Sequence, residues 1–161
     1  MTSEEQQERM QRIRELRRDL SWYKGIYTSA KENLENYDKD YQKYVTALTQ
    51  LDSIQREIGS GGKEVSNGNS KLPNYASGDK CNMASGVISA VVGMFGNTAA
   101  SVETIKTFIT KDMELLNEKY VAEYPKYSDA VDGYNRTSNI LHSYGESCDK
   151  LVLSITKKKL Q

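Results

Sequence analysis

The sequence predicts an all-α fold, built as an elongated antiparallel helical hairpin or as a three-helix coiled-coil-like bundle. Three observations predict it. Only two prolines occur in 161 residues, charged residues make up 27% of the chain, and apolar residues recur at alternating steps of three and four. The apolar share is 37%, below the ~45–50% of a typical globular domain, so we expect the apolar residues to be concentrated in narrow helix–helix contacts.

Residues 1–58 form the first predicted element, a long N-terminal heptad helix. Ser3 and Gln6 have the spacing of a capping box at its start, and acidic residues follow in the first turns. The apolar positions then define a seam in which the 3–4 alternation is unbroken, until its phase slips at Ile54 and Ile58. The seam consists of Ile13, Leu16, Leu20, Tyr23, Tyr27, Ala30, Leu34, Tyr37, Tyr41, Tyr44, Leu48 and Leu51.

Residues 59–79 are rich in glycine, serine and asparagine and predict a loop that reverses the chain or serves as a recognition segment. Residues 80–161 predict two C-terminal helices that pack with the first, with Asp79 as a possible N-cap and a break or kink near Pro125. Their predicted seam is Ile88, Val91, Phe95, Thr98, Val102, Ile105, Ile109, Leu116 and Tyr120. Beyond Pro125 it continues through Tyr134, Thr137, Leu141, Tyr144, Cys148, Leu151 and Ile155.

Residues 83–101 carry many small side chains, and small residues recur at every fourth position, as in Ser85, Ser89 and Gly93. This spacing lets two helices approach closely, which is the interpretation we favour. The alternative is membrane insertion, although the stretch holds three glycines, three serines and an asparagine.

We predict binding of a helical partner, either another protein or a second copy, through the aromatic seam and the small-residue helix. Tyrosine is enriched in protein interfaces, and glycine allows close approach of a second backbone. Trp22 lies beside the seam and is a further exposed candidate. The predicted partner-binding residues are Tyr23, Tyr27, Leu34, Tyr37, Tyr41, Tyr44, Gly86, Gly93 and Phe95.

No catalytic, cofactor-binding or metal-binding constellation is predicted. The chain has one histidine, His142, and its two cysteines, Cys81 and Cys148, are not clustered. The cysteines are expected to be reduced, with a Cys81–Cys148 bridge as the alternative. The formal net charge is zero, which gives no general attraction to nucleic acid.

The layout of a long charged helix, a polar loop and further amphipathic helices, without a visible signal peptide, resembles the small helical proteins of Gram-positive type VII secretion. These include WXG-like hairpins and the helical adaptors that accompany LXG toxins. A Tyr-X-X-X-Asp element, typical of export signals in that family, spans Tyr75 to Asp79 but precedes the second helix here. The family's Trp-X-Gly turn is missing, because Trp22 is followed by Tyr23 and Lys24.

The resemblance implies a dimerising adaptor or chaperone-like partner of a secreted toxin, in the bacterial cytoplasm or exported by a leaderless route. Two other functions remain open from the sequence. One is a structural assembly component of a virion, a phage or a cytoskeleton. The other is a membrane-inserting, pore-forming helical protein that uses residues 83–101.

Overall fold

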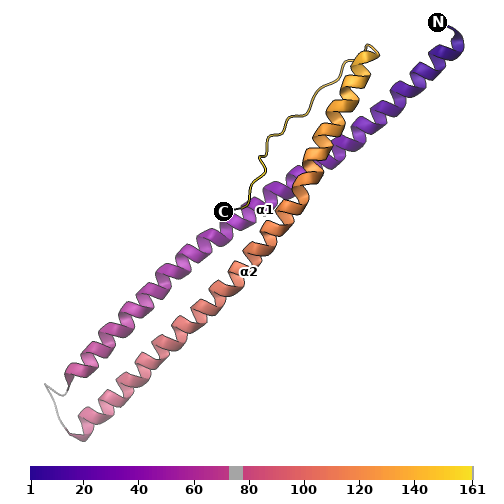
Figure 1. The fold of residues 1–161 in the computed structure, drawn as a ribbon. Coiled ribbons are helices and arrows are strands. Elements are labelled where there is room, and N and C mark those ends of the chain that lie inside the picture. Colours follow the sequence, from indigo (N-terminus) through magenta and orange to yellow (C-terminus); the bar gives the residue numbers. More distant parts are fainter. Residues whose placement is uncertain (73–77, 161) are drawn as a thin grey trace. The chain divides into compact units, whose positions relative to one another are not determined.

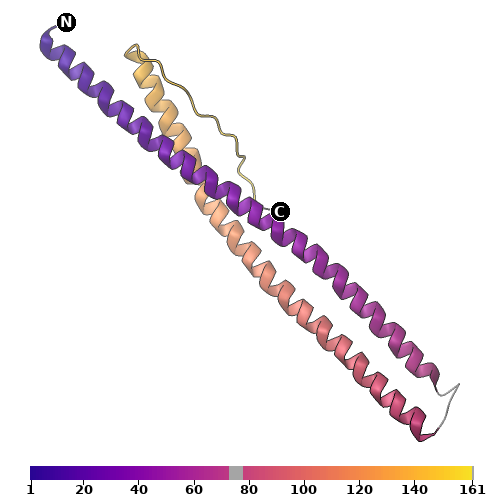
Figure 2. The ribbon, with the colours of Figure 1, turned by 180° about the vertical axis from the view of Figure 1, so that it is seen from behind.

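The computed structural model describes residues 1–72 and 78–160 and contains two long helices, α1 (Ser3–Lys71) and α2 (Asp79–Ser143) (Figures 1 and 2). No strand occurs among the described residues, which confirms the all-α prediction, and the two helices pack against each other as a hairpin. The chain divides into two compact units. Unit 1 comprises Met1–Tyr41 and Leu115–Gln161, and unit 2 comprises Gln42–Glu114.

The start of α1 is capped, one residue earlier than predicted. Thr2, not Ser3, is the N-cap: its Oγ1 accepts a bond from the Glu5 amide at 3.2 Å, and its own amide donates to Oε2 of Glu5 at 2.6 Å. This is a reciprocal capping box. A carboxylate at this position also interacts favourably with the positive end of the helix dipole, which the neutral amide of Gln6 does not.

The heptad seam of α1 has the positions that the sequence predicts. Each of the twelve predicted residues from Ile13 to Leu51 is buried or half-buried. The predicted phase slip is wrong, because Ile54 is 45% exposed and the half-buried positions continue through Gln55 and Ile58 to Val65 and Asn69. The helix therefore keeps its register by placing polar and glycine residues on the packed side.

The predicted loop at 59–79 is wrong over its first part, since α1 continues to Lys71. Each glycine in a helix interior costs about 1 kcal/mol relative to alanine, so packing must offset several such costs. The ring of Phe95 lies against this segment. A methyl group at Gly61 would be 3.3 Å from the Phe95 ring, and one at Gly62 would be 3.4 Å from its Cβ. Residues 73–77, which include Tyr75 of the export-like element, lie outside the described residues.

Helix α2 runs through Pro125 without interruption, so a break there and a third helix are both wrong. The other alternative, a kink in a continuous helix, stays a prediction. The helix ends in a Schellman motif: Gly145 has a φ of 81°, its amide donates to the carbonyl of His142, and the Glu146 amide donates to that of Leu141. Residues 146–160 are not helical. The 3–4 spacing of Cys148, Leu151 and Ile155 therefore does not reflect a helix.

The packed seam of α2 also differs from the prediction over part of its length. Val91, Thr98 and Ile105 are exposed, and their neighbours Val92, Ala99 and Lys106 are half-buried instead. From Cys81 to Leu141 the buried and half-buried residues include an unbroken 3–4 series. Tertiary packing therefore selects the strict heptad spacing over the most apolar residue at each turn.

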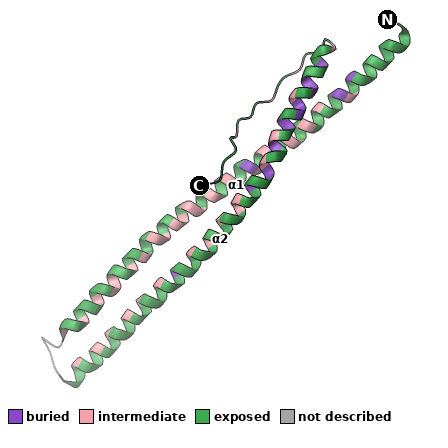
Figure 3. Ribbon diagram, viewed as in Figure 1, coloured by how far each residue is buried: buried purple, intermediate pink, exposed green. Residues whose placement is uncertain are grey.

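Fully buried residues gather in unit 1, on the C-terminal part of α2 and the part of α1 that it packs against (Figure 3). Leu34 and Tyr127 are completely buried there, and Leu160 of the C-terminal segment joins their cluster. A second cluster contains Ile13, Leu16 and Leu141. In the described part of unit 2, Val102 is the one buried residue, so the hydrophobic stabilisation of this unit is weaker.

Candidate partner-binding surfaces

The predicted aromatic seam in unit 1 is occupied by the chain's own second helix. The rings of Tyr27 and Tyr127 stack with centroids 5.4 Å apart, and Tyr37 and Tyr41 pack against the cluster that contains Leu34. Tyr23 lies against Gly133, where a methyl group would be only 2.3 Å from Cε1 of the ring. These predicted partner-binding residues hold the hairpin closed, so we expect a partner to use other surfaces.

One buried carboxylate contributes a polar contact to unit 1. Glu123 accepts hydrogen bonds from Asn33 at 3.0 Å and from Lys126 at 2.9 Å. Burial alone would raise the pKa of Glu123, but the bonds from Asn33 and Lys126 outweigh it and lower the pKa. The side chain is therefore held as a carboxylate, in a structural role between the two helices.

The seam of unit 2 is polar at several positions. The Tyr44 hydroxyl lies 3.4 Å from Oδ2 of Asp112. Lys106, at a seam position of α2, contacts Asp52 at 2.5 Å and Oε1 of Gln55 at 3.1 Å. The hydrogen bond to Asp52 raises the pKa of Lys106, and the hydrogen bond from Gln55 lowers that of Glu103.

Asn69 marks the same seam close to the end of α1. Its amide nitrogen donates weakly to the carbonyl of Ser85 at 3.4 Å and to Oγ of Ser89 at 3.2 Å. Its Oδ1 is buried without a hydrogen-bond partner. Polar residues at seam positions specify register at a cost in stability, so unit 2 is a hairpin of defined pairing but modest strength.

The predicted small-residue contacts in unit 2 divide into two groups. Phe95 faces the glycines of α1, as a residue between helices should. Gly86 and Gly93 are exposed, and nothing lies within 4 Å of a methyl group built on either one. These two glycines therefore do not serve the contact with α1 and remain on the open side of α2.

Large apolar side chains share that open side. Met83, Val87, Val91, Met94, Ile105 and Phe108 are 37–72% exposed. From Val87 on, their steps of four and three continue through Thr98 and Ser101, and each of these residues comes one position before a residue of the packed seam. We call these six residues the outer stripe. Exposed apolar residues in such a row are typical of a surface that another helix or a lipid covers.

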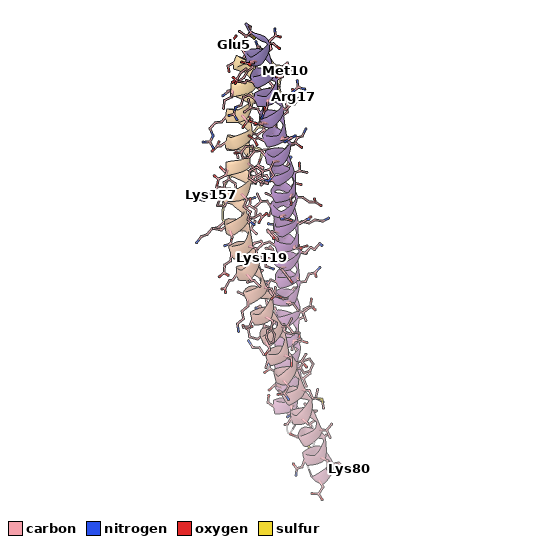
Figure 4. The ribbon with its side chains drawn as sticks, turned by 90° about the vertical axis from the view of Figure 1, so that its right-hand side faces the viewer. Glu5, Met10, Arg17, Lys80, Lys119 and Lys157 are labelled. Atoms are coloured by element: carbon pink, nitrogen blue, oxygen red, sulfur yellow. The ribbon has the colours of Figure 1, made fainter. Side chains whose placement is uncertain are left out.

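The stripe lies partly in a stretch without charge. Residues 81–102 contain no Asp, Glu, Lys or Arg, and Lys80 stands at its start (Figure 4). Helix α2 holds an 18-residue window with a mean hydropathy of 1.3, and none of that window is buried. By length and composition, this helix could cross a membrane.

Sequence reasoning missed a second surface, formed in unit 1 where the C-terminal segment lies along α2. Asn117, Tyr124, Tyr127, Asn135 and Ser138 bond to backbone atoms of that segment. Gly145, a helix-ending residue, was the sequence feature that could have indicated the reversal. Both cysteines are free thiols, and no group of three or more metal-ligating side chains occurs within residues 1–72 and 78–160.

Comparisons with known proteins found no similar protein. No protein-family model matches the chain, and neither a curated protein nor a solved structure matches it.

Proposed function

We propose that this chain is a non-enzymatic helix-binding protein, and that its docking surface is the outer stripe of α2. The observation that carries the proposal is the row of six exposed apolar side chains at helical spacing along α2. Covering the exposed part of each would contribute about 1–2 kcal/mol. Because association itself costs roughly 4–15 kcal/mol, the stripe alone supports weak binding, and a tight partner must also contact flanking positions.

The partner we propose is a long amphipathic helix or helical hairpin of another protein. Gly86 and Gly93 are also exposed on α2, and the absence of a side chain there leaves room for a closely approaching backbone. The resemblance in layout to type VII secretion proteins supports one specific partner, the helical leader of a secreted toxin, with this chain as its adaptor. That partnership would form in the bacterial cytoplasm before export.

The test is affinity capture from the native cell with the tagged chain, followed by quantification of the captured protein. We expect the double variant Val87→Glu/Met94→Glu to lose at least tenfold of the captured partner, since charge would replace apolar contact. Ser53→Glu/Ser60→Glu is the matched control, because both serines are exposed positions of α1 in the same unit. Equal capture by both double variants would remove the outer stripe as the docking surface.

Membrane insertion is the second candidate, and the uncharged stretch favours it. Residues 81–102 would span about 33 Å as a helix, close to the ~30 Å of a bilayer's hydrocarbon core. Insertion requires residues 81–102 to separate from α1, and the polar seam of unit 2 makes this separation less costly. Flotation with liposomes and release of an entrapped dye, both abolished by Val91→Lys, would favour this function over helix binding.

A further inference from the structure

The C-terminal segment of unit 1 forms an extended strap. Residues 146–160, here called the strap, turn back at Gly145 and run beside α2 (Figures 1 and 2). The Asp149 carbonyl bonds to Ser138, and the Leu160 amide bonds to Asn117. The strap thus advances by eleven residue steps while α2 runs back by 21, about 32 Å of helix, which requires a nearly extended backbone.

Side chains of α2 recognise the strap mainly through its backbone. The amide of Asn135 makes a double contact with Leu151, donating to its carbonyl and accepting from its N–H, both at 2.9 Å. The Tyr127 hydroxyl accepts from the amides of Ser154 at 2.8 Å and Ile155 at 3.2 Å. These bonds replace the hydrogen bonds that a neighbouring strand would supply. The backbone N–H and C=O groups of an extended peptide thus find partners on a helical surface.

Apolar side chains of the strap fill the groove between the helices of unit 1. Leu160 is 2% exposed within the cluster of Leu34, Tyr120 and Tyr127, and Leu151 and Ile155 pack against the same cluster. Val152 and Leu153 point away and are 72% and 46% exposed. The groove therefore combines apolar sites for selected side chains with polar contacts to the backbone, as peptide-binding grooves do.

The reversal that places the strap in this groove depends on one residue. Gly145 has a φ of 81°, in the left-handed region that glycine adopts readily. Only Tyr144 and Gly145 lie between the end of α2 at Ser143 and the strap. The first strap residue, Glu146, forms an ion pair with Arg17. If Gly145 leaves the left-handed region, the whole strap moves away from its own groove.

We propose that this groove is a binding site for an extended peptide, and that the strap of a second copy occupies it in trans. The groove of one copy offers the same contacts to the strap of another, and the second copy contributes Leu160 to the completed site. Exchange in both directions closes a two-fold dimer, the usual outcome of swapping a terminal segment across a short hinge. The cis arrangement has the advantage of a high effective concentration, so exchange increases with protein concentration.

A complementation experiment tests the exchange. One full-length variant, Leu151→Asp/Leu160→Asp, has a defective strap and an intact groove. The other, Asn135→Ala/Tyr127→Phe, has a weakened groove and an intact strap. We expect each variant alone to sediment as a monomer and an equimolar mixture to contain a 1:1 complex, detected by native mass spectrometry with one variant mass-labelled.

Two controls define the result. Adding Leu160→Asp to the groove variant should abolish the complex. Asn139→Ala in the native chain is the control for the groove substitutions: it changes an exposed position of α2 and should leave the strap bound in its groove. Circular dichroism confirms that each variant keeps its helices, and if the double strap variant does not, Leu160→Asp alone replaces it. A mixture of folded variants that contains no complex overturns the proposal.

A second variant tests the hinge in an otherwise native chain. Gly145→Pro cannot adopt a φ near 81°, because the proline ring holds φ near −65°. We expect the concentration at which half of the chain is dimeric to fall at least tenfold relative to the native protein. An unchanged monomer would overturn the proposal. The outer stripe lies in unit 2, away from the groove. Val87→Glu/Met94→Glu should therefore abolish partner capture and leave strap exchange unchanged, so the two proposals can fail independently.

Discussion

The close approach of Gly133 to Tyr23 gives the sharpest prediction for this fold. A methyl group at Gly133 would lie 2.3, 2.5 and 2.7 Å from three atoms of the Tyr23 ring, far inside the ~3.5–4.0 Å of a favourable carbon contact. The ring also contacts Trp22 at a centroid distance of 5.0 Å, which limits where it can move. We therefore place the overpacking cost of Gly133→Ala in the upper part of the usual range, about 2–3 kcal/mol.

Helix propensity acts in the opposite direction. Alanine is favoured over glycine in a helix interior by about 1 kcal/mol, so Gly133→Ala should destabilise the protein by roughly 1–2 kcal/mol. Gly25→Ala is the control, because Gly25 is exposed and a methyl group there meets nothing within 4 Å. That variant should be more stable than the native protein by about 0.5–1 kcal/mol.

The assay is a double-mutant cycle followed by urea denaturation and circular dichroism. In a Tyr23→Ala background the obstacle is gone, so Gly133→Ala should become stabilising by about 1 kcal/mol. The coupling between the two positions should then be about 2–3 kcal/mol. If Gly133→Ala stabilises the native background as much as Gly25→Ala does, the close approach does not exist and the reasoning is refuted.

Three further predictions concern other contacts. Tyr37→Ala/Tyr41→Ala should lower the free energy of unfolding by about 2 kcal/mol or more, since both rings pack within unit 1; a free energy of unfolding equal to that of the native protein would contradict this. The folded pKa of Glu123 is lowered, so its stabilisation is full above the unfolded pKa of about 4.3 and is lost as pH falls through the folded value. Glu123→Gln should flatten acid unfolding curves over that window, and curves that stay parallel would refute the assignment. Asn69→Leu should raise the midpoint of unfolding by removing a buried oxygen without a partner, worth about 1 kcal/mol, and a lower midpoint would show that its weak bonds matter more.

The first helix could be predicted well because large apolar residues occupy most positions of its seam. From Ile13 to Leu51 each seam position carries an aliphatic or aromatic side chain or alanine, and all of these residues are buried or half-buried. The prediction failed where packed positions carry polar residues. Gln55 and Lys106 occupy the seam through hydrogen bonds and an ion pair with the opposite helix, which no hydrophobic pattern on a single helix reveals.

At the glycine-rich end of α1 and in the strap, tertiary packing overrides the intrinsic secondary-structure preference of the residues. Gly61 and Gly62 are poor helix formers, yet they are the residues that accommodate Phe95. The strap residues have apolar spacing that suits a helix, but Gly145 ends α2 and the side chains of Asn135 and Tyr127 satisfy an extended backbone. Both outcomes depend on residues far along the chain, so a window of neighbouring residues cannot contain the information.

The polar seam of unit 2 has a consequence for the order of folding. Asn69 and Ser89 are 20 residues apart, whereas Asn33 and Glu123 are 90 apart. Closing the longer loop from an open chain costs about 1.3 kcal/mol more in entropy, so contacts near the chain reversal form first. They form in the unit with the least buried apolar surface, which makes the earliest hairpin readily reversible. Helices paired in a wrong register can therefore separate and pair again before the tyrosine-rich core of unit 1 forms. The weak packing of unit 2 thus favours the correct register in unit 1.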